Sequence, residues 1–192
     1  MNNKRKILIG SRKSNLAKAQ TNLTLKSLKK IGVENFFVKY VTSRGDQASY
    51  REFKKEGGKG LFTKEIDELL IKKKVDLAIH SAKDIPANID KRITIGAFLK
   101  REDVRDVLIT KNFSIKSILE LKGELRFGSS SPRRINYLKK LIPDVKIKNL
   151  RGNIENRIKK ILENKFDGTI LAIAGIKRLN LKYKNINFVK IP

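Results

Sequence analysis

Arginine, serine and glycine gather at the starts of two predicted helices in the second half of the chain. The stretch 128–134 (Gly-Ser-Ser-Ser-Pro-Arg-Arg) follows a predicted strand, with Ser131 as helix N-cap. The stretch 151–153 (Arg-Gly-Asn) precedes the next helix in the same way, and Arg157 lies further along that helix. Backbone N–H groups, hydroxyls and guanidinium groups at a helix start can hold an anion. The pattern predicts an anion site; the alternative is an ordinary Ser-Pro helix start with solvent-exposed arginines.

A second group of candidate residues lies in the first half. Arg12 and Ser14 occupy the first predicted strand-to-helix turn, which is again a helix amino terminus. The stretch 80–86 (His-Ser-Ala-Lys-Asp-Ile-Pro) follows a predicted strand, at the end where ligand sites of α/β proteins form. Asp84 is the candidate carboxylate for stabilising a positive charge or relaying a proton, unless it merely organises the turn. His80 alone is more often structural, and Arg44-Gly45-Asp46 is interpreted as a turn.

Composition limits the possible functions. The 192 residues include 45 Lys plus Arg against 19 Asp plus Glu, a net charge of +26, and lysine is scattered along the whole chain. The scatter favours a drift of the genome's codons toward A and T as the source of the lysine excess, rather than selection for a nucleic-acid-binding face. With no Cys and one His, disulfides, thiolate metal sites and multi-histidine zinc sites are excluded, and no metal is expected. We expect a cytoplasmic protein, because no signal peptide or membrane-spanning apolar run is evident.

Short apolar strands alternate with helical stretches along the whole chain, which predicts an α/β protein. The expected strands cover residues 7–9, 36–41, 76–79, 93–98, 107–110, 125–127, 145–147 and 169–172. The expected helices cover residues 14–30, 63–73, 132–141, 154–162 and 176–179. The polar stretch 43–60 is expected to be a mobile loop. A charged stretch near 99–105 is interpreted as the boundary between a first domain, 1–99, and a second, 100–192.

Eight motifs, in order along nearly the whole chain, resemble the porphobilinogen deaminase (hydroxymethylbilane synthase) family. No single motif is decisive, but their combination is highly specific. They lie at residues 10–17 (Gly-Ser-Arg-Lys-Ser-Asn-Leu-Ala, with Gln20), 42–46 (Thr-Ser-Arg-Gly-Asp), 57–62 (Gly-Gly-Lys-Gly-Leu-Phe), 80–86, 101–106 (Arg-Glu-Asp-Val-Arg-Asp), 128–134, 150–153 (Leu-Arg-Gly-Asn) and 172–179 (Ala-Ile-Ala-Gly-Ile-Lys-Arg-Leu).

The resemblance implies an activity and roles for individual residues. The family joins four porphobilinogen molecules head to tail with loss of ammonia and releases hydroxymethylbilane for tetrapyrrole and heme biosynthesis. Asp84 matches the catalytic carboxylate, which stabilises the azafulvenium cation left when ammonia departs. The residues that match the holders of the dipyrromethane cofactor are Lys83, Ser129, Ser131, Arg133 and Arg134. Those that match the substrate-binding set, active-site loop included, are Arg12, Ser14, Lys55, Lys59, Phe62, Arg151, Arg157 and Arg178.

The resemblance also implies a fold: two doubly wound domains like type II periplasmic binding proteins, facing across a cleft, plus a small third domain. Here the sequence stops at Pro192, where the family continues into a segment that returns to the first domain and then into the third. The family cysteine that anchors dipyrromethane lies in that third domain, and this sequence has no Cys. Ser129 replaces the usual threonine and keeps a hydroxyl. We therefore expect catalysis by this chain alone to be impaired.

Several alternatives stay open at this point. A separately encoded carboxy-terminal piece could supply the third domain, or the dipyrromethane cofactor could bind without a covalent bond. The chain could also be an inactive remnant. A non-catalytic anion-binding protein would share the two domains but would not need Asp84. A nucleic-acid-binding module would use the +26 charge, yet no recognition-helix, zinc-finger or basic-aromatic motif is found. We expect a monomer whose partner is porphobilinogen, with no nucleic acid and no membrane.

Overall fold

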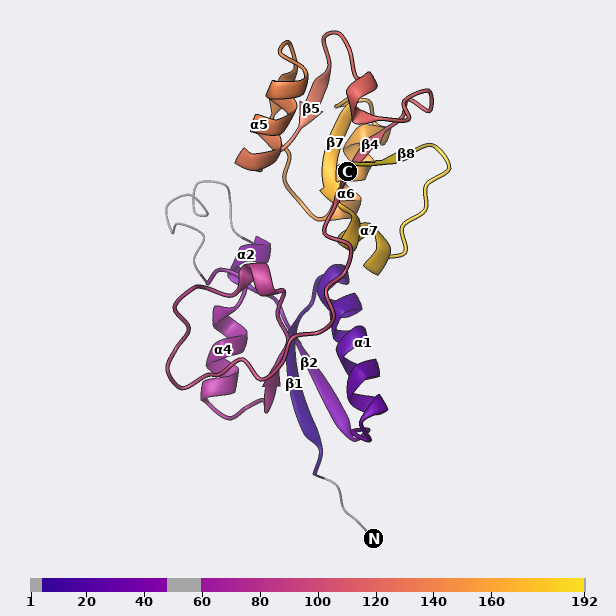
Figure 1. Ribbon diagram of the computed structural model, residues 1–192. Coiled ribbons are helices and arrows are strands. Elements are labelled where there is room, and N and C mark those ends of the chain that lie inside the picture. Colours follow the sequence, from indigo (N-terminus) through magenta and orange to yellow (C-terminus); the bar gives the residue numbers. More distant parts are fainter. Residues whose placement is uncertain (1–4, 48–59, 192) are drawn as a thin grey trace. The chain divides into compact units, whose positions relative to one another are not determined.

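The computed structural model describes residues 5–47 and 60–191 and divides into two compact units, residues 1–100 and 101–192 (Figure 1). Each unit is built around its own β-sheet. Within the described ranges, no helix combines the length and the apolarity needed to cross a membrane.

The first unit contains a parallel sheet of three strands in the order β2-β1-β3. Along the chain its elements are β1 (Ile7–Arg12), α1 (Asn15–Lys30), β2 (Phe36–Val41), α2 (Arg44–Gln47), α4 (Lys64–Ile71), β3 (Leu77–Ala78) and a 3-10 turn (Ala82–Asp84). Parallel pairing brings the carboxyl ends of β1 and β3 to the same edge of the sheet. The residues that follow these two strands are therefore neighbours.

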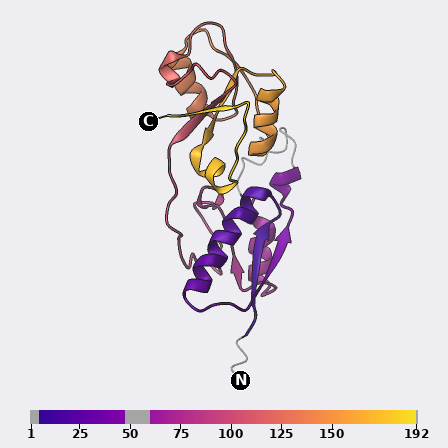
Figure 2. The ribbon, with the colours of Figure 1, turned by 90° about the vertical axis from the view of Figure 1, so that its right-hand side faces the viewer.

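Helices cover both faces of this first sheet, because successive β1 side chains point to opposite faces. The Ser11 hydroxyl lies 2.7 Å from the hydroxyl of Thr21 on α1, and both residues are fully buried. Gly10 faces the other way, where a Cβ would lie 2.8 Å from Cγ2 of Ile66 on α4. The two views agree: α1 and α4 lie on opposite sides of the strands (Figures 1 and 2). The first unit is doubly wound, as the resemblance implied.

The second unit has a sheet of five strands in the order β6-β5-β7-β4-β8, in which β4 runs antiparallel to both of its neighbours. Its elements are β4 (Asp106–Thr110), a 3-10 turn (Ile118–Glu120), β5 (Arg126–Gly128), α5 (Pro132–Leu141), β6 (Lys146–Lys148), α6 (Ile154–Leu162), β7 (Gly168–Ala172), α7 (Ile173–Arg178) and β8 (Asn187–Lys190).

The core of the second unit lies on both faces of β4. Leu108 packs with Leu138 of α5 in one cluster, whereas Val107 and Ile109 pack with Ile158 of α6 in another. All of these side chains are at most 3 % exposed. A strand covered on both faces is apolar at every position rather than at alternate ones, which explains the continuous run Val107 to Ile109.

Most expected elements are present. Strand 36–41 and helices 132–141 and 154–162 have the predicted bounds, and the last predicted helix begins earlier, at Ile173. Within the described residues, 44–47 form a helical turn in the stretch expected to be a loop, and strand β8 was not predicted. Residues 48–59 of that expected loop lie outside the described residues.

The predicted strand 93–98 is wrong, since these residues form no regular structure, and Ile95 and Phe98 are 44 % and 71 % exposed. The second unit supplies the physical reason. The orders β2-β1-β3 and β6-β5-β7 are equivalent, but β7 is followed by β4 and then β8. In the described part of the first unit no strand pairs with the outer edge of β3. Without that intermediate strand, the segment 93–98 has no partner for its backbone hydrogen bonds.

Candidate functional site

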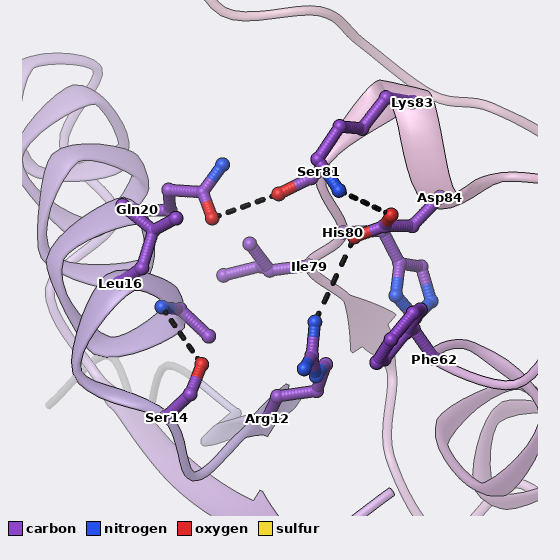
Figure 3. A pocket seen from close by; sticks show the side chains of 11 residues that line it. Arg12, Ser14, Leu16, Gln20, Phe62, Ile79, His80, Ser81, Lys83 and Asp84 are labelled. Carbon is purple, nitrogen blue, oxygen red and sulfur yellow. Dashed lines mark hydrogen bonds and ion pairs between the residues drawn. The ribbon is translucent and has the colours of Figure 1, made fainter. Parts of the chain in front are cut away.

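A pocket opens in the first unit at the carboxyl ends of β1 and β3 (Figure 3). Its volume is about 60 Å³, which is small beside the roughly 300–1,000 Å³ of a typical ligand pocket. A larger ligand must therefore extend out of it. The lining residues come from the end of β1, the start of α1, the turn before α4 and the segment after β3: Arg12, Ser14, Leu16, Ala17, Gln20, Phe62, Ile79, His80, Ser81, Lys83 and Asp84.

Asp84 is the carboxylate of this pocket. It ends the 3-10 turn 82–84, and its backbone N–H donates to the Ser81 carbonyl at 2.9 Å. Its side chain is only 11 % exposed and contacts two cations, Lys83 Nζ at 2.5 Å and Arg12 Nη1 at 3.6 Å. Lys83 is 76 % exposed, so its ammonium group reaches solvent and any ligand above the pocket.

Arg12 is held from a second direction by an aromatic ring. Its guanidinium carbon lies 4.3 Å from the centroid of the Phe62 ring, within the range of a cation–π interaction. The Arg12 side chain is 18 % exposed. Figure 3 shows Arg12 directed toward Asp84, with Phe62 beside it. The guanidinium group is thus held between an aromatic face and a carboxylate.

Hydrogen bonds fix the rest of the pocket wall. Ser14 is the N-cap of α1 and accepts from the Ala17 N–H at 3.3 Å. Ser81 donates to the side-chain oxygen of Gln20 at 2.9 Å, which ties the segment after β3 to α1. His80 Nε2 lies 3.0 Å from Asp67 Oδ1, which ties the same segment to α4. The segment that carries Asp84 is therefore fastened to both flanking helices.

In the second unit, two arginines at the start of α5 contact one carboxylate. Arg133 Nη2 lies 2.8 Å and Arg134 Nη2 lies 2.7 Å from oxygens of Asp106. Burial alone would raise the pKa of Asp106, but the hydrogen bonds from Arg134 and Arg133 outweigh it and lower the pKa. Arg133 remains 72 % exposed, whereas Arg134 is 15 % exposed.

A cluster of arginines lies near the amino end of α6. Burial lowers the pKa of Arg157, and the nearby charges of Arg134 and Arg151 lower it further. Arg157 Nε donates to the Gly152 carbonyl at 2.9 Å. At the end of α7, the buried Nε of Arg178 has no hydrogen-bond partner among the described residues. These positive charges repel one another, so an anionic ligand bound among them would be stabilised.

The serines between β5 and α5 divide into two kinds. Ser129 is 6 % exposed and its hydroxyl accepts from the Ser131 N–H at 3.2 Å, so it organises the turn. Ser130 also bonds within the protein, to the Asn149 side chain and the Leu150 carbonyl. Ser131 is the N-cap of α5, but its hydroxyl makes no capping bond. Its hydroxyl is therefore the better placed to reach a ligand.

The structure brings many of the sequence-predicted residues together within each unit. Arg12, Ser14, Phe62, Lys83 and Asp84 line the pocket of the first unit. In the second unit, the predicted residues follow β5, β6 and β7 along the chain: Ser129, Ser131, Arg133, Arg134, Arg151, Arg157 and Arg178. Lys55 and Lys59, the loop lysines, lie outside the described residues.

Sequence reasoning gave no role to several residues that shape these sites. Asp106 and Gln20 were within quoted motifs, but nothing in the sequence indicates that Asp106 faces Arg133 and Arg134. Asp67 occurs on an ordinary amphipathic helix, and its contact with His80 depends on how α4 packs against the sheet. The signal that was available for Asp106 is its place at the start of an apolar strand, where an acid is otherwise costly to bury.

The family model described as "Porphobilinogen deaminase, dipyromethane cofactor binding domain" matches residues 7–191. The porphobilinogen deaminase of Rickettsia canadensis (strain McKiel) is 44 % identical over 175 residues, which cover 91 % of this chain and 58 % of the relative. That of Oceanobacillus iheyensis is 44 % identical over 178 residues, covering 92 % and 57 %. The chain thus spans less than two thirds of the length of these relatives.

A solved structure supports the fold class. The probable amino-acid ABC transporter extracellular-binding protein from Bacillus subtilis has a TM-score of 0.51 and 13 % sequence identity, covering 96 % of this chain and 78 % of that chain. At this identity the likeness concerns the fold alone. It agrees with the expected α/β architecture of the periplasmic binding protein type.

Proposed function

The chain belongs to the porphobilinogen deaminase family, and from this premise we propose that it carries the substrate- and cofactor-binding residues of a hydroxymethylbilane synthase. The proposed reaction condenses four porphobilinogen molecules, with loss of one ammonia at each step. The observation that carries the proposal is Asp84, a carboxylate that is 11 % exposed and contacts two cations beside a pocket at the carboxyl edge of a parallel sheet.

The chemistry explains why such a carboxylate is needed. The aminomethyl group of porphobilinogen is protonated at neutral pH, so when its C–N bond breaks ammonia leaves with the bonding electron pair and the positive charge passes to the pyrrole ring. A fixed carboxylate stabilises this cation more strongly in a partly desolvated pocket than water would. The free α-carbon of the growing chain then forms the new C–C bond, and the ring proton is lost to solvent or a base.

The cations next to Asp84 have a second role in the proposal. Each porphobilinogen carries an acetate and a propionate, and Lys83 is exposed enough to contact one of them while it lies beside Asp84. Arg12 is bound on one side by Phe62 and on another by Asp84, so its orientation costs little further entropy on binding. These residues would bind the substrate and orient its ring over the carboxylate.

The second unit fits a polyanionic cofactor. A bound dipyrromethane would supply two pyrrole rings with carboxylate arms, to which the new units are added. The positive charges of Arg134 and Arg151 repel that of Arg157. The buried Nε of Arg178 lacks a hydrogen-bond partner among the described residues. Carboxylates bound here would reduce the repulsion and could accept from Arg178. Arg133, Arg134 and the Ser131 hydroxyl are the groups proposed to hold the arms nearest to α5.

The finer parts of the proposal are that the protein acts in the cytoplasm and that it is a monomer. The 192 residues contain no Cys. Analytical ultracentrifugation of the purified chain tests the oligomeric state, and a sedimenting dimer would contradict it.

The test uses calorimetric titration of the purified chain with porphobilinogen, together with measurement of released ammonia and hydroxymethylbilane. Asp84→Asn keeps the shape of the side chain and removes its charge. We expect ammonia release to fall about 100-fold, while binding of porphobilinogen weakens much less, because the carboxylate acts on the developing cation. Asp90→Asn is the matched control, since Asp90 pairs with Arg92 away from the pocket.

The outcomes separate the proposal from its alternatives. If porphobilinogen binds no better than acetate or inorganic phosphate and Asp84→Asn changes nothing, the chain is an anion-binding protein without this activity. If the wild-type chain binds porphobilinogen but releases ammonia no faster than Asp84→Asn, this chain is an inactive remnant. Ammonia release that depends on Asp84 and not on Asp90 supports the enzyme.

A further inference from the structure

The helical turn α2, which contains the Arg44-Gly45-Asp46 sequence, is fastened to the start of α4. The Gly45 N–H donates to the Leu61 carbonyl at 2.8 Å, and Leu61 is 4 % exposed. The Arg44 N–H donates to Glu65 Oε1 at 3.1 Å, and Arg44 Nε lies 3.7 Å from the same oxygen. This turn is thus held directly against the residues that flank Phe62.

Gly45 lies against the ring of Phe62, without room for a side chain. A Cβ at this position would lie 2.3 Å from Cε1 and 2.4 Å from Cδ1 of that ring, closer than carbon atoms can approach. Gly45 does not belong to the glycines with positive φ, so backbone conformation does not require glycine here. The requirement is for space, and it comes from one aromatic side chain.

The same ring is the one that contacts Arg12. The Arg12 guanidinium lies 4.3 Å from the Phe62 centroid, and its Nη1 lies 3.6 Å from Asp84. A chain of contacts therefore leads from Gly45 through Phe62 and Arg12 to Asp84. If a side chain at 45 displaced the ring, Arg12 would lose its aromatic support while the backbone around Asp84 stayed in place.

We infer that Gly45 is a positioning residue for the pocket: by lacking a side chain it lets Phe62 lie against Arg12, which fixes the guanidinium beside Asp84. The part of this inference that concerns porphobilinogen rests on the proposed function. The part that concerns the Phe62–Arg12 contact does not need any ligand.

The first experiment is free of ligand. In ¹⁵N-labelled protein, the ring current of Phe62 shifts the Nε–H resonance of Arg12, and Phe62→Ala removes that shift. We expect Gly45→Ala to move the Arg12 resonance in the same direction as Phe62→Ala does. Gly96→Ala is the matched control, because no atom lies within 4 Å of a Cβ at Gly96 and its φ is not positive. An Arg12 resonance that stays at its wild-type position in Gly45→Ala overturns the inference.

The double variant Gly45→Ala/Phe62→Ala keeps the test decisive if the single variant does not fold. Removing the ring removes the clash, so the double variant should fold and should match Phe62→Ala in its Arg12 resonance. Failure of the double variant to fold, with Phe62→Ala folded, would mean that Gly45 is needed for another reason, and the inference would be wrong.

The second experiment measures porphobilinogen binding in the wild-type protein, Gly45→Ala, Phe62→Ala and the double variant. Gly45→Ala should weaken binding about 2- to 30-fold, the range expected for the loss of a cation–π contact, and should have no further effect in the Phe62→Ala background. Additive effects of the two substitutions contradict the inference. Absence of porphobilinogen binding by the wild-type chain contradicts the proposed function. The inference about Gly45 is then tested by the resonance experiment alone.

Discussion

At the scale of single residues, a nearly buried carboxylate beside two cations occurs among the candidate residues of both units. Asp84 contacts Arg12 and Lys83, and Asp106 contacts Arg133 and Arg134. Both carboxylates are nearly buried, 11 % and 12 % exposed, which makes each dependent on its partners. The carboxylate near the pocket is proposed to act in chemistry, while that of the second unit orients arginines.

Asp106 gives a pH-dependent prediction. The pKa of Asp106 is lower in the folded protein than in an unfolded chain, where it is about 4. The ionised carboxylate therefore stabilises the fold fully above about pH 4, and this stabilisation is lost as the pH falls through the pKa of the folded protein. At pH 7, Asp106→Asn should lower the free energy of unfolding by about 1–2 kcal/mol. The difference in the free energy of unfolding between wild type and Asp106→Asn should shrink steadily as the pH falls below about 4.

Urea denaturation of both proteins at a series of pH values measures this difference. Asp144→Asn is the control, since Asp144 is an exposed carboxylate of the same unit and its removal changes the net charge equally. A difference between wild type and Asp106→Asn that is the same at pH 7 and pH 3 would show that the Asp106 charge does not stabilise the fold.

At the scale of elements, helix starts position the candidate groups. Helix α5 begins with Pro132 at its first position, and the Ser131 side chain makes no capping bond. Helix α6 begins at the Asn153 N-cap, whose side chain accepts from the Asn156 N–H at 2.8 Å. The two starts look alike in sequence, but one uses its cap residue for the helix and the other leaves a hydroxyl for a ligand.

This contrast predicts different stabilities. Asn153→Ala should lower the free energy of unfolding by about 1 kcal/mol, because the Asn156 N–H in the first turn of α6 loses its acceptor. Ser131→Ala should change it by less than about 0.5 kcal/mol, because no capping bond is lost. Chemical denaturation measures both, and equal losses in the two variants would contradict the assignment of the caps.

At the scale of the whole molecule, the two units share an arrangement of three parallel strands, and in each unit candidate residues follow the carboxyl ends of these strands. The equivalence of β2-β1-β3 and β6-β5-β7 explains why similar motifs follow the corresponding strands in both. The chain also has a net charge of +26, and the arginine cluster near α6 is a local part of that excess.

The net charge predicts that salt stabilises the fold. Raising NaCl from about 10 mM to about 150 mM shortens the screening length from about 30 Å to about 8 Å and weakens repulsion among the cations. The Tm should rise by about 2–4 °C, which corresponds to about 1 kcal/mol for a chain of this size. Sodium gluconate at equal ionic strength should give the same rise in thermal melts. A Tm that falls with salt would mean that the ion pairs outweigh the repulsion.

Much of the fold followed from local sequence. Strand 36–41 and helices 132–141 and 154–162 were predicted with their bounds, because periodicity, proline and cap residues act over a few neighbouring positions. The segment 93–98 has an equally convincing strand pattern and forms no strand, because a strand also needs a partner from elsewhere in the chain. Strand β8 is the converse: its short pattern becomes a strand through pairing with β4.

The sequence by itself determined the α/β class, the order of the motifs and the residue types available for binding carboxylates. The tertiary structure decided which of those residues meet. Only folding brings Arg12 to Asp84 and to the ring of Phe62, and only folding turns Asp106 toward Arg133 and Arg134. The physical reason is that contacts between residues distant in the chain depend on strand order and helix packing, which no local pattern specifies.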